Sequence, residues 1–251
     1  MVGRLQDKTA LVTGSTSGIG RAIAVAFAAE GAHVIVSGRD TRRGDEVVAA
    51  IRATGGEADF VAADLGGGSA AISELATKAI EAAGGQLDIL VNNAAFLMGR
   101  TETSATTEAL IDQALRVSVK APLLLTAALV PQMVARGSGV IINIGSINGL
   151  VGMAGAALYG STKAALHSFT KSWAAEFGPA GVRVNTVAPG PTLTEGVTGA
   201  RASREAIIAT TPSRTFSTPA DVAAAVVFLA SDDAANIHGA TLSVDGGFTA
   251  V

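Results

Sequence analysis

Short runs of aliphatic and β-branched residues recur along the chain, and alanine-rich stretches with little glycine or proline follow most of them. The first pattern is typical of strands buried on both faces, and the second is typical of helices. The sequence predicts seven strands, at residues 9–14, 33–38, 58–64, 87–93, 139–146, 182–190 and 240–247. It predicts helices at residues 19–30, 45–54, 69–83, 107–136, 159–177 and 221–230.

Helices that alternate with single buried strands indicate an α/β fold with a doubly wound parallel sheet, covered on both faces and joined by right-handed crossovers. No abrupt change in composition marks a linker, so we expect the 251 residues to form a single domain. Ligands of such folds bind at the carboxyl ends of the strands. The loops that follow the strands are therefore where candidate chemistry is sought.

Residues at the ends of the predicted helices agree with this fold. Gly31 and Gly178 are expected to end helices, and Thr218-Pro219-Ala220-Asp221 provides a cap, a first-turn proline and an acid at the third position. Residues 191–217 contain no clear strand and only one short helical piece, at 203–209. A long insertion after a strand is expected to form a lid over a site.

About half of the residues are apolar and only 16% are charged, which allows a large buried core. The longest apolar run, residues 121–135, is interrupted by Thr126, Pro131 and Gln132, so a buried or interface helix explains it better than a membrane span. The first residues lack the apolar core of a signal peptide and any transit-peptide bias. A cytoplasmic protein that does not enter the membrane is therefore expected.

The charges and the metal-ligating residue types exclude several partners. The net charge is −3 and no basic run occurs, which argues against nucleic acid or an anionic membrane as a partner. The chain has no cysteine, so it forms no disulfide and no thiolate metal site. His33, His167 and His238 lie far apart in the sequence, and no metal site is expected.

A glycine-rich turn follows the first predicted strand and leads directly into a helix. Its glycines permit a tight turn and a close approach of the backbone to phosphate, and the helix supplies free N–H groups. The spacing G-x-x-x-G-x-G differs from the usual dinucleotide fingerprint, so an ordinary strand–helix turn remains the alternative. The position directly after the first strand favours a pyrophosphate site. Its candidate residues are Gly14, Ser17, Gly18, Ile19 and Gly20.

The end of the second strand bears on the choice between NAD and NADP. An acid there would bind the adenine ribose hydroxyls of NAD and repel the 2′-phosphate of NADP. Gly38 occupies that place and Arg39 follows it, and a guanidinium can bind a phosphate in bidentate fashion. NADP(H) is therefore favoured. The alternative is that Arg39 is a solvated loop cation and that Asp40 binds the ribose.

Tyr159 is the only tyrosine of the chain, and Lys163 follows it by one helical turn. Residues at this spacing share a helix face, so both side chains can point into one crevice. A nearby cation favours phenolate, and together with a bound nicotinamide it is expected to lower the phenol pKa by about two or three units. Tyr159 then becomes a candidate acid and base. The alternative is a surface tyrosine beside a solvated lysine.

Ser146 stands just past the fifth predicted strand, thirteen positions before Tyr159. A hydroxyl at the carboxyl end of a strand faces the crevice, where it can hold a reacting oxygen and stabilise developing negative charge. Taken alone, such a serine is more often a loop-capping residue. The combination with Tyr159 and Lys163 favours the catalytic interpretation.

The order of these motifs resembles the short-chain dehydrogenase/reductase family over essentially the whole chain. The resemblance implies a Rossmann-type fold, nicotinamide-dependent carbonyl or alcohol chemistry and, commonly, a homotetramer. The motifs that carry it are Thr13 to Gly20, Asn92-Asn93-Ala94-Ala95, Ser146, Tyr159-x-x-x-Lys163 and Pro189-Gly190.

The same resemblance implies roles for further residues. Asp64 is similar to the family's adenine contact, Asn92 to the residue that braces the sheet, and Ala94 to a residue beside the cofactor. Lys163 is implied to bind the nicotinamide ribose in addition to tuning Tyr159. The loop implied to hold the nicotinamide ring contributes Pro189, Gly190 and Thr192.

Two positions depart from the family pattern. Ser118 stands where the family has a catalytic asparagine, and Ala95 replaces a glycine. Serine has a shorter reach and one donor where asparagine has two. The family's water relay beside the lysine is therefore expected to be altered, with Ser118 as the candidate fourth catalytic residue and slower or rerouted proton transfer. The added methyl of Ala95 is expected to reshape the pocket floor slightly.

The leading hypothesis is an NADP(H)-dependent carbonyl reductase or alcohol dehydrogenase that acts on a hydrophobic ketone or secondary alcohol. The alternatives are an acyl-carrier-protein reductase, although the loop after Asn93 has only Arg100 as a basic residue, and a non-catalytic NADP(H)-binding scaffold. Apolar surface on the helices at 107–136 and 159–177 predicts a homo-oligomer. The predicted pocket walls are Phe96, Leu97, Met98, Leu150, Val151, Met153 and Leu193.

Overall fold

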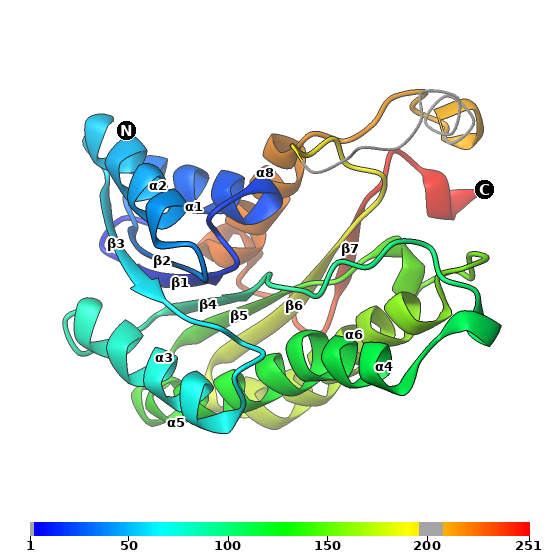
Figure 1. The fold of residues 1–251 in the computed structure, drawn as a ribbon. Coiled ribbons are helices and arrows are strands. Elements are labelled where there is room, and N and C mark those ends of the chain that lie inside the picture. The colour runs from blue at the N-terminus through cyan, green and yellow to red at the C-terminus, as the bar shows by residue number, and fades with distance from the viewer. Residues whose placement is uncertain (1–2, 196–207) are drawn as a thin grey trace.

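The computed structural model describes residues 3–195 and 208–251, which contain one seven-stranded sheet. Its strands are β1 (Thr9–Thr13), β2 (His33–Gly38), β3 (Glu57–Ala62), β4 (Ile89–Asn92), β5 (Gly139–Ile144), β6 (Val182–Pro189) and β7 (Thr241–Val244). All are parallel, in the order β3-β2-β1-β4-β5-β6-β7 (Figure 1). This confirms the predicted doubly wound Rossmann-type fold. The strand order reverses between β1 and β4, which is where such folds bind ligands.

Helices cover both faces of the sheet (Figure 1). They are α1 (Gly18–Ala29), α2 (Thr41–Ala53), α3 (Ser69–Ala82), α4 (Glu108–Leu115), α5 (Ala121–Arg136), α6 (Ala157–Phe177) and α8 (Pro219–Ala230). One hydrophobic core lies between the sheet and α1, α2 and α8, with Phe27 among its fully buried side chains. The second core lies between the sheet and α3, α5 and α6, and contains Trp173.

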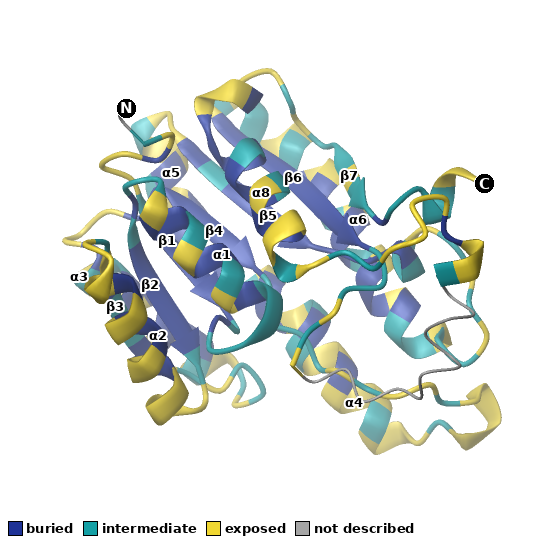
Figure 2. Ribbon diagram, turned by 90° about the horizontal axis from the view of Figure 1, so that it is seen from above, coloured by how far each residue is buried: buried dark blue, intermediate teal, exposed yellow. Residues whose placement is uncertain are grey.

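Burial along the strands follows their position in the sheet. Every residue of the inner strand β6 is buried, whereas the edge strands β3 and β7 are only partly covered (Figure 2). Strands buried on both faces lack the polar–apolar alternation of half-exposed strands. This explains why β1, β2 and β4 to β6 could be recognised in the sequence as continuous apolar runs.

Two helices differ from the predicted pattern. Helix α2 begins at Thr41 instead of residue 45, because the Asp40 side chain accepts a hydrogen bond from the Arg43 backbone N–H and caps the helix. The helix predicted over 107–136 is divided by a π-helical turn, η2 (Arg116–Lys120), which lies between α4 and α5. Such turns interrupt the regular hydrogen-bond ladder and are common at functional sites.

The predicted cap of α8 is confirmed. The Thr218 hydroxyl accepts from the Asp221 backbone N–H, and the Asp221 carboxylate accepts from the Thr218 backbone N–H. The predicted lid is described only at its two ends, residues 191–195 and 208–217, and the helix predicted at 203–209 lies mostly outside the described residues. The two ends are tied to each other, since Leu193 donates to the Ser217 carbonyl at 2.9 Å.

Among the described residues, one helical stretch is long and apolar enough to cross a membrane by length and composition, Glu108–Arg136. Core helices of folded domains meet the same criteria. In this protein, 44% of the stretch's most apolar window is buried, and α5 packs against α3 and the sheet. The packing therefore accounts for part of its apolar character.

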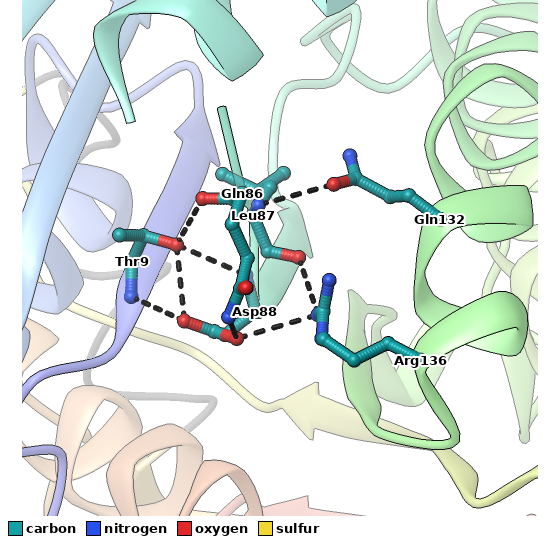
Figure 3. A network of polar contacts seen from close by, with 6 residues as sticks. All are labelled: Thr9, Gln86, Leu87, Asp88, Gln132 and Arg136. Atoms are coloured by element: carbon teal, nitrogen blue, oxygen red, sulfur yellow. Dashed lines mark hydrogen bonds and ion pairs between the residues drawn. The ribbon is translucent and has the colours of Figure 1, made fainter. Parts of the chain in front are cut away.

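A polar network ties the amino-terminal ends of β1 and β4 to α5 (Figure 3). Asp88 accepts hydrogen bonds from the Thr9 backbone N–H at 2.9 Å, from the Gln86 side chain at 2.8 Å and from Arg136 at 3.3 Å. Only 12% of its side chain is exposed. Because the donors converge on one carboxylate, its removal leaves several of them without a partner.

We expect Asp88→Ala to lower the free energy of unfolding by about 2 kcal/mol, because several partly buried donors lose one buried acceptor. Urea denaturation measures the effect. Glu74→Ala is the control, since this acid pairs with Lys78 on the surface of α3 and its loss is expected to stay within experimental error. Equal effects of the two substitutions would show that the network does not stabilise the strand ends.

Candidate active site

One large cavity, of about 1620 Å³, lies at the carboxyl ends of the strands. Its wall is built from the loops after β1 to β6 and from the first turns of α6. The structure places most of the residues selected from the sequence in this wall. They are Gly14, Ser17, Gly18, Ile19, Gly20, Arg39, Asp64, Ala94, Ser146, Tyr159, Lys163, Pro189, Gly190 and Thr192.

The glycine turn has the shape of a phosphate cradle. Gly14 has a φ of +63°, and a Cβ there would lie 2.9 Å from the Ala94 Cα, so a side chain fits neither the backbone nor the space. A Cβ on Gly20 would overlap the Asn93 amide nitrogen. The Ser17 side chain makes no capping bond to α1, which leaves the N–H groups of the first turn for a ligand. These features fit the pyrophosphate of a dinucleotide.

The end of β2 places two arginines and an acid in the cavity wall, Arg39, Arg43 and Asp40. The Asp40 carboxylate caps α2 and lies 3.4 Å from the Arg43 Nε. Arg39 forms no ion pair with any residue that the structure describes. Arg39 is therefore the cation at the end of β2 that remains available to a ligand, whereas the Asp40 carboxylate is occupied by Arg43 and by the helix cap.

Three polar side chains meet at the other end of the cavity. Ser146 follows β5, and its Oγ accepts a hydrogen bond from the Asn148 backbone N–H at 3.2 Å. Tyr159 lies in the first turn of α6, and the Lys163 Nζ lies 5.8 Å from its ring centroid. The Lys163 Nζ also donates to the Ile144 carbonyl at 2.8 Å. The end of β5 therefore fixes both Ser146 and Lys163.

The electrostatics of the pair differ from the expectation that Lys163 lowers the pKa of Tyr159. Burial raises the pKa of the phenol above 10, and the hydrogen bond with Ser146 opposes this shift. Burial also lowers the pKa of Lys163 to about 8. In the protein without a nicotinamide, the cost of burying the phenolate therefore outweighs the lowering expected from the cation, and the ammonium is directed to the Ile144 carbonyl. The expected lowering included a bound nicotinamide, and it stays a prediction.

Two selected residues, Asn92 and Ser118, do not line the cavity. The Asn92 amide donates to the Asn143 side chain at 2.9 Å, so it joins β4 to β5 and does not face a ligand. Ser118 is buried in the π-helical turn, where its Oγ accepts from the Phe96 backbone N–H at 3.0 Å. Its side chain therefore holds the loop after β4.

The bond between Asn92 and Asn143 belongs to a longer buried ladder across the sheet. The Asn143 amide donates to the Thr170 hydroxyl of α6 at 2.8 Å, and that hydroxyl lies 2.6 Å from the Thr186 hydroxyl of β6. Asn143, Thr170 and Thr186 are all fully buried. Satisfied networks of this kind fix one arrangement of the elements that they join. The ladder joins β4, β5 and β6 to α6, which carries Tyr159.

Several wall residues were not found from the sequence. The Thr194 methyl would lie 3.5 Å from a Cβ on Gly18, so the start of the lid reaches the glycine turn. Glu195 lies 3.4 Å from Arg21 of α1. Arg116 and Val117 enter the wall from the π-helical turn. Thr194 could have been suspected from the sequence, because it is a second threonine, two residues after Thr192, in the loop that follows Pro189-Gly190. No local sequence pattern predicts a π-helical turn.

Of the predicted hydrophobic walls, Phe96 and Leu97 line the cavity. Leu97, Leu150 and Leu193 are 81%, 46% and 43% exposed, so an apolar surface lies open on the loops after β4, β5 and β6. Met153 is in contact with Arg100, its sulfur lying 3.4 Å from the guanidinium. The other predicted walls, Met98, Leu150, Val151, Met153 and Leu193, are not part of the cavity wall.

Comparisons with known proteins agree with the geometry. A family model described as "Enoyl-(Acyl carrier protein) reductase" matches residues 14–249. Cyclopentanol dehydrogenase from a Comamonas strain is 37% identical over 252 residues, which cover 99% of this chain and 100% of that protein.

Two solved structures are also similar. A putative β-ketoacyl-ACP reductase is 43% identical, with a TM-score of 0.88 over 98% of this chain and 100% of that one. A putative NAD(P)-dependent gluconate 5-dehydrogenase from Beutenbergia cavernae, with bound NADP, is 37% identical, with a TM-score of 0.90 over 98% of both chains. The chain therefore belongs to the short-chain dehydrogenase/reductase family and is an oxidoreductase of that family.

Proposed function

We propose that the protein transfers hydride between NADP(H) and a hydrophobic ketone or secondary alcohol, with Tyr159 as the acid and base. The observation that supports this most directly is that Ser146, Tyr159 and Lys163 share one cavity with the glycine turn. Hydride transfer to a carbonyl requires a proton donor and an oxygen-binding hydroxyl beside the cofactor. The three side chains provide that set.

The cofactor would be held along the whole cavity. The turn at Gly14 to Gly20 would bind the pyrophosphate, Arg39 the 2′-phosphate and Asp64 the adenine. Pro189 to Thr192 would hold the nicotinamide ring. The bound nicotinamide supplies or accepts the hydride.

Each catalytic side chain would have a separate task. In reduction, the Ser146 hydroxyl binds the substrate oxygen and Tyr159 donates its proton to it. In oxidation, Tyr159 accepts the proton from the alcohol. The buried Lys163 ammonium stabilises the phenolate that reduction leaves behind, and low solvent exposure strengthens this attraction.

Phe96 and Leu97 in the cavity wall, and the exposed Leu150 and Leu193 on the loops after β5 and β6, support a hydrophobic substrate. The similarity to a cyclopentanol dehydrogenase points to the same class. An acyl-carrier-protein substrate is the second candidate, because the family model and one similar structure are named for such reductases. The exposed Arg100 is the basic group that such a carrier would meet.

Exposed apolar residues on α4 and α5 support a homo-oligomer, and we infer a homotetramer from the family resemblance. Ile111, Leu115 and Leu123 are 36%, 42% and 41% exposed on neighbouring turns. A second copy of these helices would cover them. Such an assembly would also explain why a stretch this apolar is only partly buried in one chain.

We expect Tyr159→Phe to reduce kcat about 100- to 10,000-fold in NADPH-dependent reduction of a cyclic ketone, because the proton donor is lost. The dissociation constant for NADPH, measured by fluorescence, is expected to stay close to that of the wild type. Ser161→Ala, on the exposed side of the same helix, is the control. NADPH binding by the wild type without turnover of any ketone would favour the non-catalytic scaffold instead.

Cofactor choice is tested with Arg39→Ala. We expect NADPH to bind at least about tenfold more weakly, because a charge-assisted phosphate contact is removed, while NADH binding changes little. Arg42→Ala is the control, since Arg42 pairs with Glu46 on α2 and does not line the cavity. Equal weakening of both cofactors would assign Arg39 to general charge and not to the 2′-phosphate.

The buried ammonium predicts a pH dependence of stability. The pKa of Lys163 is about 8 when folded and 10.5 ordinarily, so between these values the unfolded chain binds more protons than the folded one. Stability then rises with pH across this window. We expect the free energy of unfolding of wild type relative to Lys163→Met to rise by about 3 kcal/mol from pH 8 to 10.5. Lys171→Met, on the exposed face of α6, should show no such trend.

A further inference from the structure

A buried histidine that the proposed mechanism does not use lies on α6 behind the catalytic residues. His167 follows Lys163 by one helical turn and Tyr159 by two, on the same side of the helix. It is only 6% exposed, and neither ring nitrogen has a hydrogen-bond partner among the described residues. A buried polar group without partners costs stability, so its presence calls for a physical explanation.

The ring packs against the backbone on both sides of Ser146. A Cβ on Gly145 would overlap the His167 Nε2 and lie 2.7 Å from its Cδ2. A Cβ on Gly149 would lie 3.0 Å from the His167 Cε1. At Gly145 the imidazole occupies most of the space that a side chain would need. At Gly149 the α6 backbone is the nearest obstacle, because a Cβ would lie 2.8 Å from the Ala164 backbone nitrogen, and the imidazole edge comes next.

These contacts leave the turn that carries Ser146 with little freedom. The Gly145 backbone N–H donates to the Val187 carbonyl of β6 at 2.8 Å, and the Gly149 N–H donates to the Ser146 carbonyl at 3.0 Å. The sheet holds one side of the turn, and the His167 ring lies against the other side together with the backbone of α6. In a closely packed interior, removal of the ring would leave a cavity into which the turn can move.

Proton transfer is not a suitable role for this ring. Burial, with Lys163 and Lys171 nearby, lowers the pKa of His167 to about 4, so the imidazole is neutral near neutral pH and is a weak base. Neither nitrogen has a hydrogen-bond partner within residues 3–195 and 208–251 that could pass it a proton. The contacts of the ring with the turn are steric.

We propose that His167 is a positioning residue for the reaction, and that its ring supports the Gly145–Gly149 turn and thereby holds the Ser146 hydroxyl beside Tyr159. The inference rests on the proposed function for its kinetic consequence. Its structural consequence does not depend on that function, because Ser146 lies close enough to the phenol in the protein alone to lower the pKa of Tyr159. Loss of that contact is expected to raise the pKa of Tyr159.

The test compares His167→Ala, which removes the support, with His167→Leu, which keeps a similar volume without nitrogens. Because Tyr159 is the only tyrosine, the near-ultraviolet absorbance of phenolate reports its titration alone. We expect the titration midpoint to move to higher pH in His167→Ala, as in Ser146→Ala, and to stay near the wild-type value in His167→Leu. Ser168→Ala, on the exposed face of α6, is the control.

Kinetics provide the second measurement. We expect His167→Ala to lower kcat for ketone reduction about 10- to 100-fold, with the NADPH dissociation constant unchanged, because a misplaced hydroxyl affects the reaction and not cofactor binding. His167→Leu should retain most of kcat and the wild-type pH profile. Thermal unfolding of each variant identifies any that is simply unfolded.

An unchanged tyrosine titration in a folded His167→Ala would overturn the inference, whatever the kinetics. Loss of kcat with a shifted pH profile in His167→Leu would also overturn it, by assigning the role to the ring nitrogens. Normal turnover by Tyr159→Phe, or no turnover by the wild type, would contradict the proposed function. Neither result affects the titration test, which does not require turnover.

Discussion

The shared direction of seven parallel strands is the constraint on which the site depends. Because every strand ends at the same edge, the glycine turn after β1, Arg39 after β2 and Ser146 after β5 all enter one cavity. The buried ladder from Asn92 through Asn143 to α6 then fixes the middle strands relative to the helix that carries Tyr159 and Lys163. The fold brings the parts together and the ladder sets their spacing.

The site is costly to the folded state. Burial lowers the pKa of Lys163 to about 8, and it raises the pKa of Tyr159. A phenol that resists ionisation thus lies near an ammonium that burial destabilises, and the nearby His167 adds two ring nitrogens that have no hydrogen-bond partner in the described part of the chain. Unfavourable burial of ionisable groups is typical of functional sites.

Much of the fold could be predicted because its signals are local. Continuous apolar runs identified the inner strands, and the capping residues of α8 were correct in detail. The start of α2 was missed because Asp40 was considered as a ribose ligand and not as a cap. The π-helical turn at Ser118 has no sequence signature, so the bond of that hydroxyl to the Phe96 backbone could not be anticipated.

The site was predictable as a set of residues but not in its electrostatics. Spacing places Tyr159 and Lys163 on one face, yet it says nothing of burial, and burial decides the direction of the tyrosine pKa shift. The polar ladder and the support under Ser146 also depend on contacts between elements distant in sequence. Thr194 was missed for the same reason, since only the folded chain brings it to Gly18.

The central claim is that Tyr159 becomes an effective acid and base only when the cofactor completes its surroundings. The most direct measurement is a spectroscopic titration of this single tyrosine in the free protein and with saturating NADP⁺. We predict a midpoint above the ordinary range of a phenol in the free protein, because burial raises the pKa of Tyr159, and a midpoint lower by about two units or more with NADP⁺, whose nicotinamide adds a positive charge. An identical midpoint in both states would contradict it.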